Sequence, residues 1–467
     1  MTIDIIPDDV LLEIFAFYVE EASFYSKDMW HTLVHVCRTW RILVFRSPRR
    51  LNLQLQCGTS AKPVPSREML GIWPPLPIVL MQSGHLAWDT DNIMAILEHT
   101  DRVCEITLEL WDASGSQFKK ALVAMQEPFP ALTILQLRTR NVTQVIPNSF
   151  LGGSAPRLQA LTLDKIAFPG LRKLLPSATH LIDLYLQGIP HSGYISPEAM
   201  VTCLSALTRL QTLCLTFQSP QSHPDRESRR PLLLTRSILP ALTDFVFHGV
   251  SEYLEDFVAR IDSPMLDDMD ITFFYQVIFD IPNLPQFISR TPSLKAHDEA
   301  CVDIFKSGVC LGPVRLLTRG FKVELELPVG QSGWPLPSPF AQVCRSSFPH
   351  TFFSSWENLY IRDRTPSYPW EDEIENAQWL ELLHLFTSVK NLYLSEKVTP
   401  FFAPVLKEIV EERIVEILPA LQGLFLEEAR PARPVRKAIS QFVAARQLSG
   451  HPITVSRWVK EENADWY

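Results

Sequence analysis

The chain has 467 residues, 46% of them hydrophobic and 20% charged, which is enough for two or three domains or for one elongated array. Its net charge of −9 argues against a general nucleic-acid binder, whose footprint would be basic. No apolar run is long enough and free of proline to span a membrane, and the eight cysteines show no zinc-type spacing. The composition predicts a soluble protein of the cytoplasm or nucleus, without a metal, a cofactor or a membrane partner.

Residues 1–50 are predicted to form two short amphipathic helices. Pro7 suits the first helical position, and Asp8 follows it where the helix dipole favours negative charge. Two apolar sets then recur at helical spacing, the first being Val10, Leu11, Ile14, Phe15 and Tyr18 and the second Trp30, Leu33, Val34, Cys37, Trp40 and Val44. Two helices this short cannot bury both faces against each other, so part of this surface needs another partner.

This pairing of helices resembles the F-box, the motif that docks substrate receptors onto the Skp-type adaptor of a cullin-based ubiquitin ligase. The resemblance rests on Ile6-Pro7, Leu11, Ile14-Phe15, Leu33, Val36-Cys37-Arg38 and Trp40-Arg41. The runs 46–51 and 72–78 are similar to F-box-like proteins that are abundant in mushroom-forming fungi. The resemblance implies that adaptor docking uses Pro7, Val10, Leu11, Ile14, Leu33, Val36, Cys37 and Trp40.

One feature departs from the usual F-box pattern. The polar link from Glu20 to Met29 is longer than the usual turn between F-box helices. The alternative is a helical hairpin that only packs on its own domain. Residues 51–100 are predicted to link this module to the rest of the chain and to form a capping repeat. Within them, Leu51–Leu55 and Ile78–Met81 are typical of strands, and Trp88–His99 is typical of a helix.

After residue 100 one pattern keeps returning: an apolar residue, two others, an apolar residue, one other, and a third apolar residue. It begins at Val103, Leu132, Leu158, Leu181, Leu210, Leu242, Leu266, Trp356, Val389 and Leu421. From Leu132 to Leu266 the starting positions are 26, 23, 29, 32 and 24 residues apart, close to the period of leucine-rich repeats. The alternation that closes each pattern predicts a strand with one buried face.

The segments between these patterns have helical spacing, so each unit is predicted to be helix, turn and strand. Such units cannot bury their apolar faces alone, and neighbours must stack. Residues 101–467 therefore resemble an irregular leucine-rich-repeat solenoid of the α/β class, with parallel strands on the concave face and helices on the convex face. The asparagine that these repeats usually carry after the strand is missing. A compact α/β domain with alternating elements is the alternative.

Recognition by such an array is expected on the strand face that points away from the helices, because strand neighbours alternate between faces. The mixture of aromatic, amide and charged groups there fits a protein-binding surface better than a catalytic one. The residues expected to bind a target protein are Gln136, Arg138, Tyr185, Asp270, Tyr393 and Phe425.

Motifs of enzymes are missing: the sequence contains no GxSxG, HExxH, P-loop or GxGxxG. A basic cluster, Arg430 to Lys437, is expected to be a solvated loop rather than a phosphate site. The sequence therefore predicts a non-enzymatic substrate receptor of a cullin-based ubiquitin ligase, with a Skp-type adaptor, the cullin subunits and a target protein as partners. The alternative is a leucine-rich-repeat interaction scaffold that is not associated with a ligase.

Overall fold

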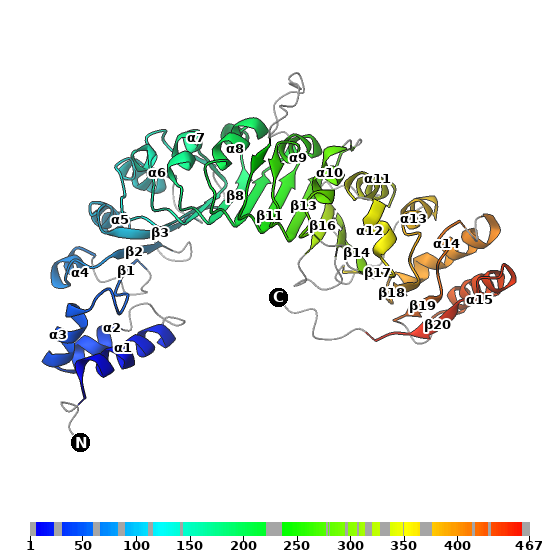
Figure 1. Ribbon diagram of the computed structural model, residues 1–467, viewed down its shortest axis with the longest axis horizontal. Helices are drawn as coiled ribbons and strands as arrows, with labels where there is room; N and C mark the ends of the chain where they lie inside the picture. Colours follow the sequence, from blue (N-terminus) through cyan, green and yellow to red (C-terminus); the bar gives the residue numbers. More distant parts are fainter. Residues whose placement is uncertain are drawn as a thin grey trace. The chain divides into compact units, whose positions relative to one another are not determined.

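The computed structural model divides the chain into two compact units, residues 1–194 and 195–467 (Figure 1). It describes residues 6–22, 30–58, 66–82, 89–110, 115–140, 143–220, 236–276, 279, 281–294, 298–305, 308–312, 320–326, 337–348, 350–364, 376–412, 416–427 and 431–459. The predicted boundaries at residues 50 and 100 stay predictions.

The N-terminal module of unit 1 contains helices α1 (Asp8–Ala22), α2 (Trp30–Val36) and α3 (Arg38–Arg46). The predicted second helix is thus two helices, because Cys37 interrupts it with an extended backbone, φ −156° and ψ 170°. The Cys37 Sγ accepts a hydrogen bond from the Trp40 N–H at 3.4 Å and so caps α3. Arg41 Nε donates to the Val34 carbonyl at 2.8 Å and closes the end of α2.

The segment that follows holds β1 (Leu55–Cys57), α4 (Ser66–Ile72), β2 (Ile78–Gln82) and α5 (Thr90–Leu97). The prediction of a strand over Leu51–Leu55 was wrong. Residues 49–52 form a turn in which Asn52 has φ +47°, and the Leu53 N–H donates to the Pro48 carbonyl at 2.9 Å. Leu51 and Leu53 are still buried, but they precede the strand, which begins only at Leu55. The predicted strand over Ile78–Met81 is confirmed by β2.

The sheet of unit 1 has the strand order β1-β2-β3-β4-β6-β8, and its neighbours pair in parallel. Its remaining strands are β3 (Val103–Leu110), β4 (Ile134–Thr139), β6 (Ala160–Asp164) and β8 (Asp183–Ile189). The helical segments between them are α6 (Gly115–Ala124), η2 (Phe150–Gly153), α7 (Leu171–Leu174), η3 (Leu175–Ser177) and η4 (His191–Gly193), and the short strands β5 (Gln144–Val145) and β7 (Ile166–Ala167) pair separately.

The sheet of unit 2 has the order β9-β11-β13-β16-β15-β14-β17-β18-β19-β20. Its repeat strands are β9 (Thr212–Phe217), β11 (Asp244–Gly249), β13 (Asp268–Phe274), β17 (Asn358–Asp363), β18 (Asn391–Leu394), β19 (Gly423–Leu426) and β20 (Thr454–Arg457). All ten sequence patterns after residue 100 therefore end in a strand, and the predicted repeat is confirmed. The short strands β10 (Ser237–Ile238) and β12 (Ile261–Asp262) form a pair of their own.

The prediction that all strands are parallel was wrong in the middle of unit 2. There β14 (Glu299–Phe305), β15 (Gly308–Gly312) and β16 (Phe321–Glu326) form an antiparallel meander. The meander runs backwards through the sheet, so that β16 pairs in parallel with β13 and β14 pairs in parallel with β17. Antiparallel neighbours need only a short connection, whereas parallel neighbours need a crossover. Few residues therefore separate β14 from β15.

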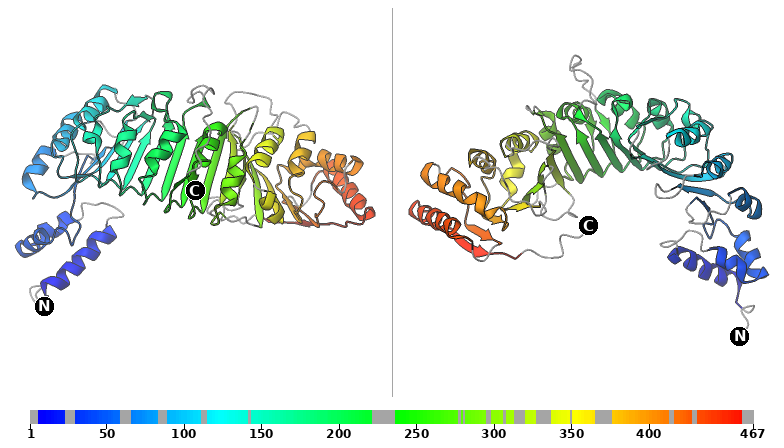
Figure 2. Two further views of the ribbon diagram at one scale, coloured as in Figure 1. Left: turned by 45° about the horizontal axis from the view of Figure 1, so that its top comes forward. Right: turned by 180° about the vertical axis from the view of Figure 1, so that it is seen from behind.

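Helices line one face of each sheet (Figure 1 and Figure 2). In unit 2 they are α8 (Pro197–Leu204), α9 (Ser251–Val258), α10 (Asn283–Ser289), α11 (Pro337–Ser347), α12 (His350–Ser355), α13 (Asn376–Leu383), α14 (Thr399–Glu412) and α15 (Arg433–Leu448). Helices α11 and α12 lie in a stretch whose proline and serine content would suggest a loop. Phe348 anchors them, with its ring 4.7 Å from Phe321 and 5.2 Å from Trp356.

Arginines tie several repeats to the repeat before them, in place of the missing asparagine ladder. Arg102 donates twice to the Leu76 carbonyl, at 3.0 and 3.1 Å. Arg446 is fully buried and donates to the carbonyls of Leu418 and Leu421 at 3.2 and 3.1 Å. A guanidinium carries five N–H donors on a long side chain, so it can reach backbone carbonyls of the preceding repeat.

Candidate protein-binding surfaces

The N-terminal module hides one side of α1 and exposes the other. Leu11 and Phe15 are buried, and Phe15 lies against Trp40 with ring centroids 4.6 Å apart. Val10, Ile14 and Phe17 are 48%, 50% and 67% exposed. Residues four and three apart lie on one face of a helix, so these three side chains form a single apolar strip. We call Val10, Ile14 and Phe17 the α1 strip.

The other residues predicted to dock the adaptor have different environments. Pro7 is exposed just before α1, and Val36 is 58% exposed at the end of α2. Leu33, like Leu11, belongs to the module's own core. Cys37 is exposed and caps α3, while Trp40 is partly buried. A partner would therefore meet the α1 strip, Pro7 and Val36 directly, whereas Leu11 and Leu33 hold the helices together.

The face of the module that carries Trp30 packs on residues further along unit 1. Trp30 is fully buried, and its Nε1 donates to the Gln54 carbonyl at 2.9 Å. The Trp73 ring lies 5.3 Å from Trp30 and stacks on His31 at 4.8 Å. Burial, followed by the nearby His35, lowers the pKa of His31, so this imidazole is neutral in the folded module.

The open face of unit 1, the sheet face turned away from the helices, carries the predicted residues Gln136, Arg138 and Tyr185. Gln136 lies between Thr107 and Thr162 in a row across the strands, and Tyr185 follows Thr162. Arg138 belongs to the next row, where its Nη1 lies 3.3 Å from the Glu109 carboxylate. The residues named on this face are polar, and the charge of Arg138 is paired with Glu109.

The open face of unit 2 carries an aromatic ladder, which we define as Tyr360, Tyr393, Phe425 and Trp458. Tyr360 and Tyr393 stack at 4.2 Å with 9° between their planes, and Tyr393 and Phe425 stack at 4.5 Å with 13°. Trp458 lies edge-on to both tyrosines at 5.9 Å, and its Nε1 donates to the Leu394 carbonyl at 3.2 Å. The predicted residues Tyr393 and Phe425 are thus brought together.

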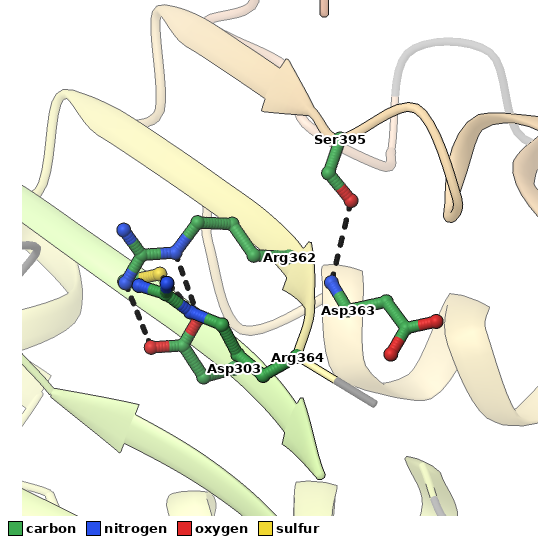
Figure 3. Close-up of polar contacts among 6 residues, drawn as sticks. Asp303, Arg362, Asp363, Arg364 and Ser395 are labelled. Carbon is green, nitrogen blue, oxygen red and sulfur yellow. Dashed lines mark hydrogen bonds and ion pairs between the residues drawn. The ribbon is translucent and has the colours of Figure 1, made fainter. Parts of the chain in front are cut away.

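A buried ion cluster lies on the same face of β14 and β17 as Tyr360, because side chains two residues apart share a face. Arg362 Nε and Nη2 each donate to Asp303 at 2.7 Å, and both side chains are only 9% exposed. Arg364 Nε donates to the same carboxylate at 3.3 Å. Figure 3 shows the guanidinium groups of Arg362, from β17, and of Arg364, just after it, reaching toward Asp303, while the Asp363 N–H donates to the Ser395 hydroxyl. Two cations share one carboxylate here.

Asp270, the remaining predicted residue, pairs with a lysine of the inserted meander. Lys322 Nζ lies 3.0 Å from the Asp270 carboxylate and 3.5 Å from that of Glu324. Burial opposes the charge on Lys322, but its neighbours Cys310, Asp270 and Glu324 outweigh that effect and raise the pKa of the ammonium group. The negative charge of Asp270 is therefore balanced by Lys322, which makes Asp270 a weaker contact for a positively charged group of a target.

Sequence reasoning missed Tyr360, Arg362, Asp303 and Trp458. A signal existed for the first two, because they occupy the same positions after Trp356 that Tyr393 and Ser395 occupy after Val389. Asp303 lies on an inserted strand outside the repeat pattern, and Trp458 follows the last strand. Neither position has a place in the repeat, so only the folded chain brings them to the ladder.

Among the described residues, no group of three His, Cys, Asp or Glu side chains could hold a metal ion. None of the described helices combines the length and the apolar character needed to cross a membrane. The described cysteines are free, and burial raises the pKa of the thiols of Cys301, Cys310 and Cys344 well above the usual range, so these three are poor nucleophiles.

The chain repeats a unit of helix, turn and strand. The repeat strands pair in parallel register, and the helices lie along one sheet face. This arrangement defines a repeat protein of the leucine-rich-repeat-like class. No protein-family model and no curated protein sequence match the chain. Among solved structures it is similar to the TLR13–ssRNA13 complex, with 12% identity, a TM-score of 0.32 and coverage of 86% of this chain and 49% of that chain. The chain thus spans about half of that protein's length.

A second similar structure is the leucine-rich repeat-containing protein LegL7 from Legionella pneumophila. The identity is 12%, the TM-score is 0.27, and the match covers 86% of this chain and 99% of that chain. With TM-scores this low, the class of this protein rests on its own strand order and register.

Proposed function

We propose that this chain is the substrate-recognition subunit of a cullin-based ubiquitin ligase. In this proposal the helices α1–α3 dock onto a Skp-type adaptor, and the open faces of the repeat sheets bind a target protein. Other subunits perform the ubiquitin transfer. The protein itself binds two partners and catalyses no reaction.

The observation that carries the proposal is the α1 strip. The module already has a closed core of Leu11, Phe15, Leu33 and Val34, yet three large apolar side chains stay in solvent. An apolar strip of this kind marks an interaction site in a folded protein. Together with the F-box-like sequence of residues 6–41, it supports docking of an apolar partner surface.

The target-binding half of the proposal is supported by the aromatic ladder. Tyrosine and tryptophan dominate the energetics of protein interfaces, because they bury a large area and lose little side-chain entropy. The ladder presents such side chains in a row across the adjacent strands β17, β18 and β19. This row suits a protein segment with apolar side chains.

The test is capture of the full chain by a purified Skp-type adaptor. The double variant Val10→Asp, Ile14→Asp is expected to lower the affinity at least about 30-fold, because about half of each side chain remains to be buried and the new charges oppose burial. Neither side chain belongs to the module's core, so circular dichroism is expected to be unchanged.

A matched control is Val123→Asp, Ile238→Asp, which changes one exposed valine and one exposed isoleucine outside the module. This control is expected to bind the adaptor like the unaltered chain. Equal capture of the unaltered chain and the α1-strip variant would refute adaptor docking through α1.

A second candidate function is an interaction scaffold without a ligase, in which the module is only a cap. It is favoured by the packing of Trp30 on Gln54 and Trp73. The same capture experiment separates the two functions, since a cap has no affinity for the adaptor.

A further inference from the structure

The last described repeat has a charge opposite to that of the whole protein. Residues 431–459 contain Arg433, Arg436, Lys437, Arg446 and Arg457 and no aspartate or glutamate, although the chain carries a net charge of −9. Arg446 is buried against backbone carbonyls, but the other four are exposed. A concentration of one charge in one repeat attracts a partner of the opposite charge.

Two of these residues, Arg436 and Arg457, line a groove between α15 and β20, which lie beside each other at the end of unit 2 (Figure 1). The groove has a volume of about 560 Å³. Its floor and walls include Leu426, Ile439, Val443 and Val455, and Arg436 and Arg457 lie along it. Arg436 Nη2 donates to the Pro431 carbonyl at 3.3 Å. Within the described residues, no acidic side chain lines the groove.

One edge of the groove is a strand with an unpaired side. β20 pairs with β19 in parallel, and it is the last strand in the described sheet. The N–H groups of Thr454 and Trp458 donate to carbonyls of Gln422 and Leu426, at 2.8 and 3.1 Å. Because backbone groups alternate sides along a strand, those of Val455 and Arg457 point to the outer edge. All four residues of β20 are exposed, and Val455 is 42% exposed.

We propose that this groove binds an extended acidic segment of a partner protein, which adds a strand to the outer edge of β20. The backbone of the segment would pair with Val455 and Arg457, as in recognition by strand addition. Its apolar side chains would enter the groove beside Ile439 and Val443, and its carboxylates would pair with Arg436 and Arg457. This site is separate from the α1 strip and from the aromatic ladder, and it does not depend on the proposed ligase function.

The experiment uses the full chain and a fluorescent peptide of alternating valine and glutamate, with binding followed by anisotropy. Reversing both groove charges, Arg436→Glu with Arg457→Glu, is expected to weaken binding about tenfold or more, because two attractive pairs become repulsive. The control Arg433→Glu with Lys437→Glu makes the same change in net charge on exposed residues of α15 outside the groove lining. It is expected to weaken binding less than threefold.

Val455→Pro tests strand addition. It removes an N–H that points to the outer edge and leaves the N–H groups that donate to β19. Binding is expected to fall about fivefold or more through loss of this donor and the clash of the ring with an added strand. Unchanged binding by a folded Val455→Pro variant would overturn strand addition, and the charge-reversal pair tests the groove if that variant does not fold.

Other occupants give different results, and each would overturn the proposal. Loss of binding in the control pair equal to that in the groove pair would indicate a general charge effect. An oligonucleotide of equal charge that competes fully would indicate a nucleic acid. A dimer that dissociates only in the groove-charge variant, seen by sedimentation, would indicate a second copy of this chain. No binding of the peptide at millimolar concentration would also refute it.

Discussion

At the scale of single residues, Asp303 is a buried carboxylate of unit 2 that needs a counter-charge. It is buried on the sheet face that lacks helices, and its carboxylate forms ion pairs with Arg362 and Arg364. A buried ion pair contributes little net stability compared with apolar residues, but the loss of one partner leaves an uncompensated charge. The cluster therefore fixes the register of the inserted strand β14 against β17 more than it adds to the free energy of folding.

Asp303→Asn is expected to reduce the stability of unit 2 by about 3 kcal/mol, because the buried Arg362 guanidinium and the partly buried Arg364 guanidinium lose their counter-charge. Glu357→Gln is the control, since it breaks an ion pair with Lys390 that is 42–50% exposed and is expected to cost less than about 1 kcal/mol. Urea unfolding followed by circular dichroism measures both. Similar midpoints for the two variants would contradict the structural role of the cluster.

Tyr360 is expected to make unit 2 less stable as the pH rises into the alkaline range. Burial, then the Glu299 carboxylate and Tyr393, raise the pKa of its phenol above the usual value. The unfolded chain therefore loses the Tyr360 proton at a lower pH than the folded protein does. The resulting stability is fully present below about pH 10, the unfolded pKa, and falls as the pH rises above it.

Tyr360→Phe is expected to remove part of this alkaline loss, because phenylalanine keeps the ring stack and has no proton to lose. The measurement is the thermal midpoint of both proteins at neutral pH and above pH 10. Parallel curves for the two proteins would show that the Tyr360 phenol is not protected.

At the scale of elements, the repeat pattern predicted the strands well. The pattern alternates apolar and other residues, which matches the alternation of buried and exposed side chains along each strand. Leu135 and Leu137 enter the core from β4, while Gln136 and Arg138 stay outside, as the alternation requires. Residues 337–355 were harder to predict, because they contain few aliphatic residues and the nearby glycines and prolines favour loops. Their phenylalanines at helical spacing find a site only because Phe321 and Trp356 are brought next to them.

The meander β14–β16 illustrates what local patterns cannot specify. The alternation of apolar and polar residues in Phe321–Glu326 is typical of a strand, and β16 lies there. The direction of β16 and its neighbours depend on contacts with β13, whose paired residues are 52 positions away, and with β15, whose paired residues are 12 to 18 positions away. The break between α2 and α3 at Cys37 could not be predicted from local pattern either. Cys37 belongs to an apolar set at helical spacing, and only the structure shows that its thiol caps α3.

At the scale of the whole molecule, the N-terminal module has one exposed apolar face and one face packed against later residues of unit 1. The α1 strip is free for a partner, while Trp30 and His31 cover Trp73. In repeat proteins the terminal elements protect the apolar end of the array. The module therefore serves stability as well as the proposed docking.

Deletion of residues 1–50 is expected to lower the thermal midpoint and to cause aggregation, because Trp73 and the end of the sheet at β1 lose their cover. Size-exclusion chromatography with light scattering measures this outcome. The full-length Val10→Asp, Ile14→Asp variant is expected to remain monomeric with an unchanged midpoint. A soluble fragment with the original midpoint would show that the module is only an appended domain.

The sequence by itself determined the repeat, the positions of its strands and the apolar face of the first helix, because these depend on the spacing of side chains along a few turns or pleats. Only the tertiary structure decided which of those side chains meet. It separated Leu11 and Leu33, which form a core, from Val10 and Ile14, which remain in solvent. It also assembled the aromatic ladder, the Asp303 cluster and the basic groove from distant segments, since strand neighbours and direction are set by long-range backbone pairing that no local pattern encodes.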